Sequence, residues 1–488
     1  MSTEQQQTGA DPAEEWFDVV VVGAGPVGEN VADRVRAGGL TVAVVEQELV
    51  GGECSYWACM PSKALLRPVQ AVADVRRVRG AREAVTGRLD TAEVVARRNA
   101  VVGDWDDSGA AGWLTGIGAE LVRGHGRLAG PRRVVVSPSD GGPERRLAAR
   151  HAVAMATGSD PVLPPLPGMA EARPWTSRDA TSAKAAPARL AVVGGGVVGV
   201  EMATAWQALG SSVTLLVRGG GLLPNMEPFA GELVADGLRE AGVDVRFGVS
   251  ATRLARPAAD GPVTLTLDDG STLEADEVLF ATGRKPRTGD LGLDTVGLTP
   301  GAWLDTDDTL RVTDVEDGWL YAVGDVNHRA LLTHQGKYQA RIAGSVIVAR
   351  ARDEWQDTLP WGAHAATADV HAVPQVVFTD PEATAVGLST EQAERAGMRV
   401  RAVDYDMGSV AGAYLYADEY KGRARMVVDL DRGRLVGATF VGPGTAELLH
   451  AATIAIAGEV PIDRLWHAVP AYPTISEVWL RLLEAYRG

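Results

Sequence analysis

The chain contains two cysteines, Cys54 and Cys59, within the segment GGECSYWACMPSK of residues 51–63. A disulfide requires Cα atoms within about 7 Å, and a straight helix points residues five apart in different directions. We therefore expect Cys54 on a distorted turn that leads into a helix, and Cys59 in the first turn of that helix, just before Pro61. Free N–H groups and the helix dipole stabilise a thiolate there, so Cys59 is expected to be the better thiolate and Cys54 the more exposed partner.

Two other readings of this pair are a structural role and a metal site. Zinc requires more ligands at short spacing, and no further Cys or nearby His supplies them, so no metal is predicted. In a reducing compartment a close, isolated cysteine pair is more often catalytic than structural. The two sulfurs are therefore the best candidates for the chemistry of this protein.

Composition narrows the class of protein. A length of 488 residues favours two or three domains, and the net charge of -16 argues against a nucleic-acid or anionic-membrane partner. No run of eighteen apolar residues occurs, and residues 1–15 are polar and acidic, unlike a signal peptide. We expect a disordered tail over residues 1–15 and a cytoplasmic protein without membrane contact.

A dinucleotide fingerprint begins the folded part. A predicted buried strand over residues 17–22 leads into a glycine-rich loop and a helix over 30–37, and the next strand, 41–45, ends at an acid, Glu46. The glycines of the loop are Gly23, Gly25 and Gly28. They let the backbone approach a pyrophosphate at the helix N-terminus, while the acid binds ribose hydroxyls.

A second fingerprint follows a predicted strand over residues 190–193, so the chain should bind two dinucleotides. Its glycines are Gly194, Gly196 and Gly199, and its helix covers residues 201–209. The next strand, 213–217, ends at Arg218 where an NAD site would carry an acid. Arginine suits a 2′-phosphate, so NADPH is favoured, with NADH and a merely solvent-exposed Arg218 as the alternatives.

The redox segment and both fingerprints resemble those of the pyridine nucleotide-disulfide oxidoreductases, which include dihydrolipoamide dehydrogenase, glutathione reductase and mercuric reductase. The resemblance covers nearly the whole chain and implies an α/β protein with two Rossmann-like dinucleotide-binding domains, for FAD and NAD(P), and a C-terminal α+β dimerisation domain. It implies an FAD domain over 16–160 and 290–364, an NAD(P) domain over 161–289 and an interface domain over 365–488. The segment PQVVFTDPEATAVGL, residues 374–388, resembles the start of that interface domain and implies a homodimer with shared active sites.

The same resemblance implies further cofactor-binding residues. They lie in the redox segment, in two Ala-Thr-Gly turns, in a Gly-Asp pair and at the start of a helix: Gly52, Thr157, Gly158, Gly283, Gly324, Asp325 and Thr333. Lys63, one helical turn after Cys59, and Glu201 match the family's ion pair near the flavin and the nicotinamide. His334, next to Thr333, is expected to be structural.

The chain departs from the family at the catalytic acid–base residue. Disulfide-reducing members carry His in an HPTxxE motif, whereas this chain has Tyr472 before Pro473 and Glu477 at the end of the motif. A tyrosine with a pKa of about 10 cannot act as a base at neutral pH, but it can donate a proton or a hydrogen bond. His467 is a weaker candidate for the missing role and is expected to be structural.

The residues around the cysteines also depart from the family pattern. Tyr56, Trp57 and Ala58 replace smaller residues, and Glu53 replaces a common Thr. The two aromatic rings would narrow the site or offer a flat surface to an aromatic acceptor. The carboxylate of Glu53 would tend to raise the pKa of a neighbouring thiol, because it is a like charge.

Three hypotheses follow for the function. The first is an FAD-dependent enzyme that passes electrons between NADPH and a small disulfide, dithiol or related electrophile through Cys54 and Cys59. The second is an NAD(P)H:quinone-type reductase in which the dithiol is secondary and Tyr472 donates a hydrogen bond. The third is a non-catalytic flavoprotein, against which the two intact fingerprints argue.

Overall fold

The computed structural model describes residues 14–488, so nearly all of the predicted tail lies outside the described residues. The first strand begins at Glu15, inside the segment predicted as tail, because Glu15 pairs with Arg145 on a neighbouring strand. Two compact units are present among the described residues: unit 1 comprises 14–54, 106–160 and 285–366, and unit 2 comprises 55–105, 161–284 and 367–488. Over residues 14–488, no helix is both long and apolar enough to span a bilayer.

Unit 1 is built on a mainly parallel sheet. Its strands are β1 (Glu15–Val22), β2 (Val42–Glu46), β3 (Glu120–Leu128), β4 (Arg133–Pro138), β5 (Arg145–Met155) and β15 (Leu320–Ala322). The parallel part runs in the order β3-β2-β1-β5-β15, and β4 pairs antiparallel with both β3 and β5. The valine run that ends β1 is fully buried, as expected for a strand covered on both faces.

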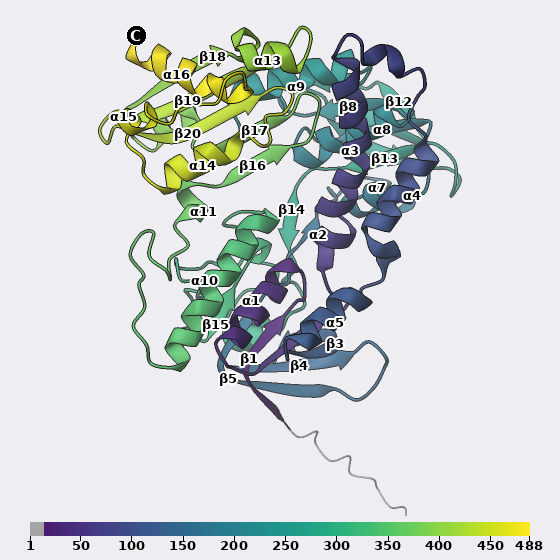
Figure 1. Ribbon diagram of the computed structural model, residues 1–488. Coiled ribbons are helices and arrows are strands. Elements are labelled where there is room, and N and C mark those ends of the chain that lie inside the picture. The colour runs from purple at the N-terminus through teal and green to yellow at the C-terminus, as the bar shows by residue number, and fades with distance from the viewer. Residues whose placement is uncertain (1–13) are drawn as a thin grey trace, which may run out of the picture. The chain divides into compact units, whose positions relative to one another are not determined.

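Two helices lie side by side along this sheet, α1 (Pro26–Ala37) and α10 (Thr333–Ala351) (Figure 1). Their approach is close, because a Cβ at Gly344 of α10 would stand 2.7 Å from the side chain of Arg34 on α1. Nearer the N-terminal ends, a Cβ at Gly336 of α10 would stand 2.5 Å from the side chain of Val27 on α1, so these ends also lie close together.

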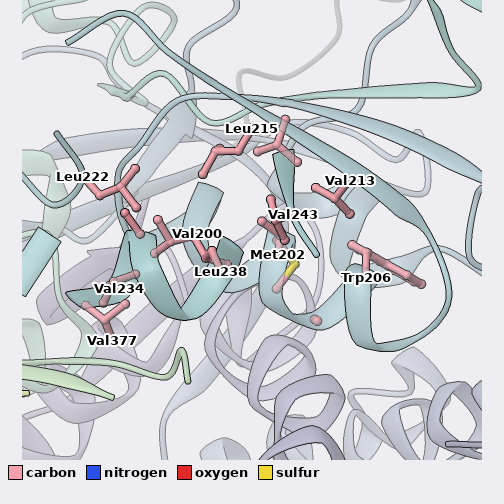
Figure 2. Packing of buried hydrophobic residues seen from close by; sticks show 14 of the residues in the cluster. Val200, Met202, Trp206, Val213, Leu215, Leu222, Val234, Leu238, Val243 and Val377 are labelled. Atoms are coloured by element: carbon pink, nitrogen blue, oxygen red, sulfur yellow. The ribbon is translucent and has the colours of Figure 1, made fainter. Parts of the chain in front are cut away.

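Unit 2 also contains a parallel sheet. Its strands are β7 (Arg189–Val193), β8 (Ser212–Val217), β9 (Asp244–Phe247) and β13 (Glu277–Phe280), in the order β13-β7-β8-β9. Helices α8 (Val197–Ala208) and α9 (Pro228–Glu240) bury apolar faces in one cluster with these strands, which includes Trp206 and Leu215 (Figure 2). A small antiparallel sheet, β10 (Ala251–Ala255), β11 (Val263–Leu267) and β12 (Thr272–Ala275), adds a separate core cluster.

The C-terminal part of unit 2 is an antiparallel sheet with helices. The strand order is β16-β17-β20-β19-β18. Their bounds are β16 (Pro374–Val377), β17 (Ala383–Gly387), β18 (Val400–Asp406), β19 (Arg423–Asp429) and β20 (Arg434–Val441). Helices α14 (Leu449–Ala457) and α16 (Val478–Arg487) pack on this sheet. The two parallel sheets and this α+β part confirm the predicted fold class.

The remaining helices include the segment that carries the cysteines. They are α2 (Gly52–Tyr56), α3 (Cys59–Arg76), α4 (Thr91–Val101), α5 (Ser108–Gly116), α6 (Met169–Ala172), α7 (Ser177–Ser182), α11 (Ala368–His371), α12 (Thr390–Arg395), α13 (Ala411–Tyr416) and α15 (Ile462–Leu465). Strand β5 begins at Arg145, well before its run of small apolar residues starts at Ala152. Its first half, RRLAARH, has little apolar content, and it is a strand because it pairs with β4 and, at Leu147 to Ala149, also with the start of β1.

One partly buried carboxyl group on α1 makes stability depend on pH. Burial raises the pKa of Glu29 to about 7, against the opposing attraction of Lys337 on α10. A raised carboxyl pKa means that the folded state holds a proton that the unfolded state releases above about pH 4.5. The stability of the folded state therefore falls as the pH rises from about 4.5 to about 7.

We therefore predict that Glu29→Gln stabilises the protein more at pH 8 than at pH 5. The gain in the free energy of unfolding should be larger at pH 8 by about 1–3 kcal/mol. The thermal midpoint at each pH, followed by circular dichroism, measures this. Equal effects at both pH values would contradict the assignment.

Candidate functional site

The first glycine-rich loop joins β1 to α1. Gly23 has φ +102°, and a Cβ there would clash with the carbonyl oxygen of Ala156, while a Cβ on Gly28 would clash with that of Gly23. Gly25 is the N-cap of α1, and no side chain caps that helix end. The loop thus presents backbone N–H groups at a helix N-terminus, which is the arrangement that binds a pyrophosphate.

Glu46, at the end of β2, lies against this loop. Its Oε2 accepts a hydrogen bond from Ala24 N at 2.7 Å, and its Oε1 accepts one from Glu48 N at 2.8 Å. Burial raises the pKa of Glu46, because desolvation outweighs these hydrogen bonds. Each carboxylate oxygen retains capacity for a further donor, as a ribose hydroxyl would supply.

The loop also positions the start of the cysteine segment. Gly51 N donates to the Ala24 carbonyl at 2.8 Å, and a Cβ on Gly52, whose φ is +57°, would stand 2.8 Å from Gly25 Cα. The short helix α2 begins at Gly52 and contains Cys54. After a break, α3 begins at Cys59, which agrees with the predicted helix start, and no side chain caps this end of α3. Both cysteines are partly exposed.

The remaining predicted flavin contacts of unit 1 gather at two turns and a helix end. Thr157 and Gly158 follow β5, Gly324 and Asp325 follow β15, and Thr333 begins α10. Two residues that the sequence analysis missed hold these turns. Ser159 Oγ donates to Asp325 Oδ2 at 2.5 Å, and the buried Gln339 accepts from Gly324 N at 2.7 Å through its Oε1.

These residues of unit 1 fit FAD. The Oγ1 of Thr157 is buried without a hydrogen-bond partner among the described residues, so a polar ligand atom would satisfy it. The loop of residues 23–28 would hold the pyrophosphate, Glu46 a ribose, and Asp325 the ribityl-phosphate region. The N-terminus of α10 would supply N–H groups to the flavin pyrimidine.

The second glycine-rich loop repeats the first within unit 2. Gly194 has φ +123° and leaves no room for a Cβ beside the Ala281 carbonyl, and Gly199 leaves none beside the Gly194 carbonyl. By contrast, a Cβ on Gly196, the N-cap of α8, would meet nothing within 4 Å. That open side is where a second pyrophosphate would approach. Arg218 is exposed just after β8, and Gly283 follows β13 with φ +140°.

Lys63 and Glu201 form the ion pair expected from their positions. Lys63 Nζ on α3 lies 2.8 Å from Glu201 Oε2 on α8, and Phe378 N donates to Glu201 Oε1 at 3.1 Å. Lys63 Nζ also lies 5.1 Å from the centroid of the Phe378 ring. The Glu201 side chain is only 3% exposed, so these donors compensate a buried charge.

The aromatic residues between the cysteines are held by unit 2. The guanidinium of Arg178, on α7, lies 4.2 Å from the centroid of the Trp57 ring, and Thr181 Oγ1 donates to the Trp57 carbonyl at 2.8 Å. Trp105 Nε1 donates to the Tyr56 carbonyl at 3.2 Å. Because Arg178 covers one face of Trp57, at most the other face of this ring is open to a flat acceptor.

The C-terminal acid–base candidates, Tyr472 and Glu477, lie in different surroundings within one chain. Tyr472 is 76% exposed, whereas Glu477 is buried and its Oε1 accepts from Arg481 Nη2 at 2.6 Å. The Oε2 of Glu477 has no hydrogen-bond partner among the described residues. His467 is exposed near the same end of the chain. Over residues 14–488, no cluster of three or more His, Cys, Asp or Glu side chains could hold a metal ion.

Comparison with known proteins identifies two matching family models. Residues 17–345 match the pyridine nucleotide-disulphide oxidoreductase model, and residues 373–482 match the dimerisation domain of the same family. The chain is 31% identical to a dihydrolipoyl dehydrogenase of Halobacterium salinarum, over 96% of both chains. It is 32% identical to a mercuric reductase of Shigella flexneri, over 94% of this chain and 79% of that protein.

Solved structures show the same fold. The Cu(II) complex of RclA, a HOCl-induced flavoprotein disulfide reductase from Escherichia coli, has a TM-score of 0.80 at 22% identity, over 96% of this chain and 99% of that chain. LpdA from Mycobacterium tuberculosis has a TM-score of 0.79 at 24% identity, over 96% of this chain and 98% of that chain.

The second loop yields a prediction with a matched control. Gly196→Ala should leave the thermal midpoint unchanged but raise KM for the nicotinamide nucleotide, NADPH or NADH, by about tenfold, because the new Cβ occupies the open approach to the N-terminus of α8. Gly199→Ala should instead destabilise the protein by about 1–3 kcal/mol through overpacking. Unchanged KM in Gly196→Ala would contradict nucleotide binding at this loop.

Proposed function

The chain belongs to the pyridine nucleotide-disulphide oxidoreductase family, whose members use FAD and NAD(P)H, and we propose that it is a disulfide-relay enzyme. In this proposal Cys54 and Cys59 pass electrons between NADPH and a small disulfide, dithiol or related electrophile. The observation that carries it is the position of Cys59 as the first residue of α3, one turn before the Lys63–Glu201 pair.

The position of Cys59 supports its role as the thiolate that remains inside the site. The first N–H groups of α3 lack intrahelical partners, and the helix dipole adds positive potential there. Both effects favour the charged sulfur. When bound, FAD supplies the two-electron chemistry that connects the nicotinamide to sulfur.

Cys54 would carry out exchange with the substrate. Its thiolate attacks one sulfur of a substrate disulfide, forms a mixed disulfide and releases one thiol. The Cys59 thiolate then attacks the Cys54 sulfur, which releases the second thiol and leaves a Cys54–Cys59 disulfide. Two electrons pass from the dithiol to the substrate, and each released thiolate takes a proton.

Tyr472 is the residue proposed to donate a hydrogen bond to the departing thiol. The dimerisation domain supports a homodimer, and the exposure of Tyr472 (76%) and Val469 (84%) suits a segment that a second subunit covers. Tyr472 of one subunit would then complete the site of the other. Because a phenol is neutral at pH 7, it would donate a hydrogen bond and not act as a base.

NADPH is the proposed electron donor, with NADH as the alternative. Arg218 is exposed just after β8, beside three glycines, Gly219 to Gly221, whose Cβ positions are open. A guanidinium there suits a 2′-phosphate.

The division into FAD, NAD(P) and interface domains at the boundaries given above stays a prediction. A cytoplasmic location also stays a prediction, and a reactive dithiol would persist in that reducing compartment.

Replacement of Cys54 tests this function. Cys54→Ser should lower NADPH-dependent reduction of small aromatic and aliphatic disulfides at least about 100-fold, because exchange requires a thiolate. The variant should retain its flavin and its reduction of a quinone dye. Steady-state rates with NADPH and each acceptor measure both activities.

Ser55→Ala, at the neighbouring position, is the control and should keep both activities. If Cys54→Ser reduced disulfides at the wild-type rate, the relay would be wrong. If the wild type reduced only quinones, and did so without Cys54, a quinone-type reductase would replace the proposal.

A further inference from the structure

Arg287 forms ion pairs around the residue that precedes Cys54. Its Nη2 lies 3.4 Å from Glu53 Oε2, its Nε lies 2.5 Å from Asp160 Oδ1, and its Nη1 lies 3.8 Å from Glu48 Oε2. All four residues belong to unit 1. The side chains of Arg287 and Glu53 are 22% and 19% exposed, so water screens this interaction only in part.

The backbone around Arg287 is fixed as well. Arg287 N donates to the Gly158 carbonyl at 3.2 Å, at the turn that follows β5. The guanidinium is a planar, permanently charged group, so a cation is present here at every working pH. The link therefore connects the first turn of α2, which carries Glu53 and Cys54, to the Gly158 turn.

The charge of Glu53 bears directly on its neighbour Cys54. A carboxylate next to a thiol disfavours the thiolate, and thiolate is the form that attacks disulfides. A guanidinium paired with that carboxylate cancels part of this effect at a distance of several ångströms. Further charged groups near this turn include Glu48, Asp160 and the Arg123–Asp107 pair, whose Asp107 also accepts from Val50 N at 2.7 Å.

We propose that Arg287 is a positioning residue for the dithiol: by pairing with Glu53 it offsets the negative charge beside Cys54 and fixes the first turn of α2. This inference rests on the proposed function, in which Cys54 is the exchanging thiol. It modifies the expectation from sequence, since Glu53 acts on Cys54 together with a partner 234 residues away.

The chain allows the thiol of Cys54 to be measured alone. It has two cysteines, so a Cys59→Ser background leaves Cys54 as the single thiol. The rate of iodoacetamide alkylation against pH then gives the pKa of Cys54. This readout does not depend on turnover, so it remains valid if the relay itself proves wrong.

Arg287→Gln should raise the pKa of Cys54 by about half to one unit and slow alkylation at pH 7 about three- to tenfold. Glu53→Gln should shift the pKa in the opposite direction and speed alkylation. The double variant should return most of the way to the parent, and Arg287→Lys, which keeps the charge, should stay near it.

Arg311→Gln is the matched control. Arg311 forms a partly exposed pair with Asp307 at 2.9 Å in the same unit, so its loss changes the net charge equally but should leave the alkylation profile unchanged. Flavin content checks that each variant is folded. If Arg287→Gln does not fold, Glu53→Gln still tests the inference, because it must speed alkylation.

Two results would overturn the inference. One is an alkylation profile that Glu53→Gln and Arg287→Gln leave unchanged. The other is a double variant, Arg287→Gln with Glu53→Gln, in which the pKa of Cys54 stays as high as in Arg287→Gln alone. Arg287 would then act on Cys54 without Glu53. If the variants shift the pKa of Cys54 as predicted but the wild type does not reduce disulfides, the proposed function is wrong. The inference that Arg287 pairs with Glu53 to set the charge beside Cys54 would still hold.

Discussion

The buried charge of Glu201 is the constraint on which the candidate site depends. A carboxylate that is 3% exposed must be compensated, and its two donors come from distant parts of the chain: Lys63 on α3 and the backbone of Phe378 next to β16. Removing one partner of a buried pair costs about 3–5 kcal/mol, and the partial exposure of Lys63 puts this pair near the lower end. The interaction thus ties the helix that begins at Cys59 to the helix of the second glycine-rich loop and to the C-terminal sheet.

The two glycine-rich loops solve one steric problem in the same way. In each, the first glycine has a positive φ and lies against a carbonyl from a neighbouring turn, and the last glycine, three residues into its helix, leaves room for the carbonyl of the first. The result is a helix N-terminus without a side-chain cap, at α1 and again at α8. Such an end is suited to a phosphate, since its N–H groups have no partner within the helix.

Local patterns in the sequence predict much of this arrangement. The fingerprints, the start of a helix at Cys59 and the Lys63–Glu201 pair follow from spacing and from family resemblance. Contacts between distant residues were missed, because no local pattern records them. Ser159 holds Asp325 across 166 positions, and the Glu53–Arg287 pair spans 234. The pair of Glu477 and Arg481 is different, because its i,i+4 spacing is a local signal from which it could have been predicted.

In the proposed dithiol relay, Cys59 acts as a thiolate beside the flavin. An anaerobic titration of the purified flavoprotein with NADPH, followed by its visible spectrum, tests it most directly, with Cys59→Ser as the control. The account predicts a long-wavelength absorption band in the wild type that is absent in the control, because only a thiolate can donate charge to the flavin. Bleaching directly to reduced flavin in both proteins would contradict the relay.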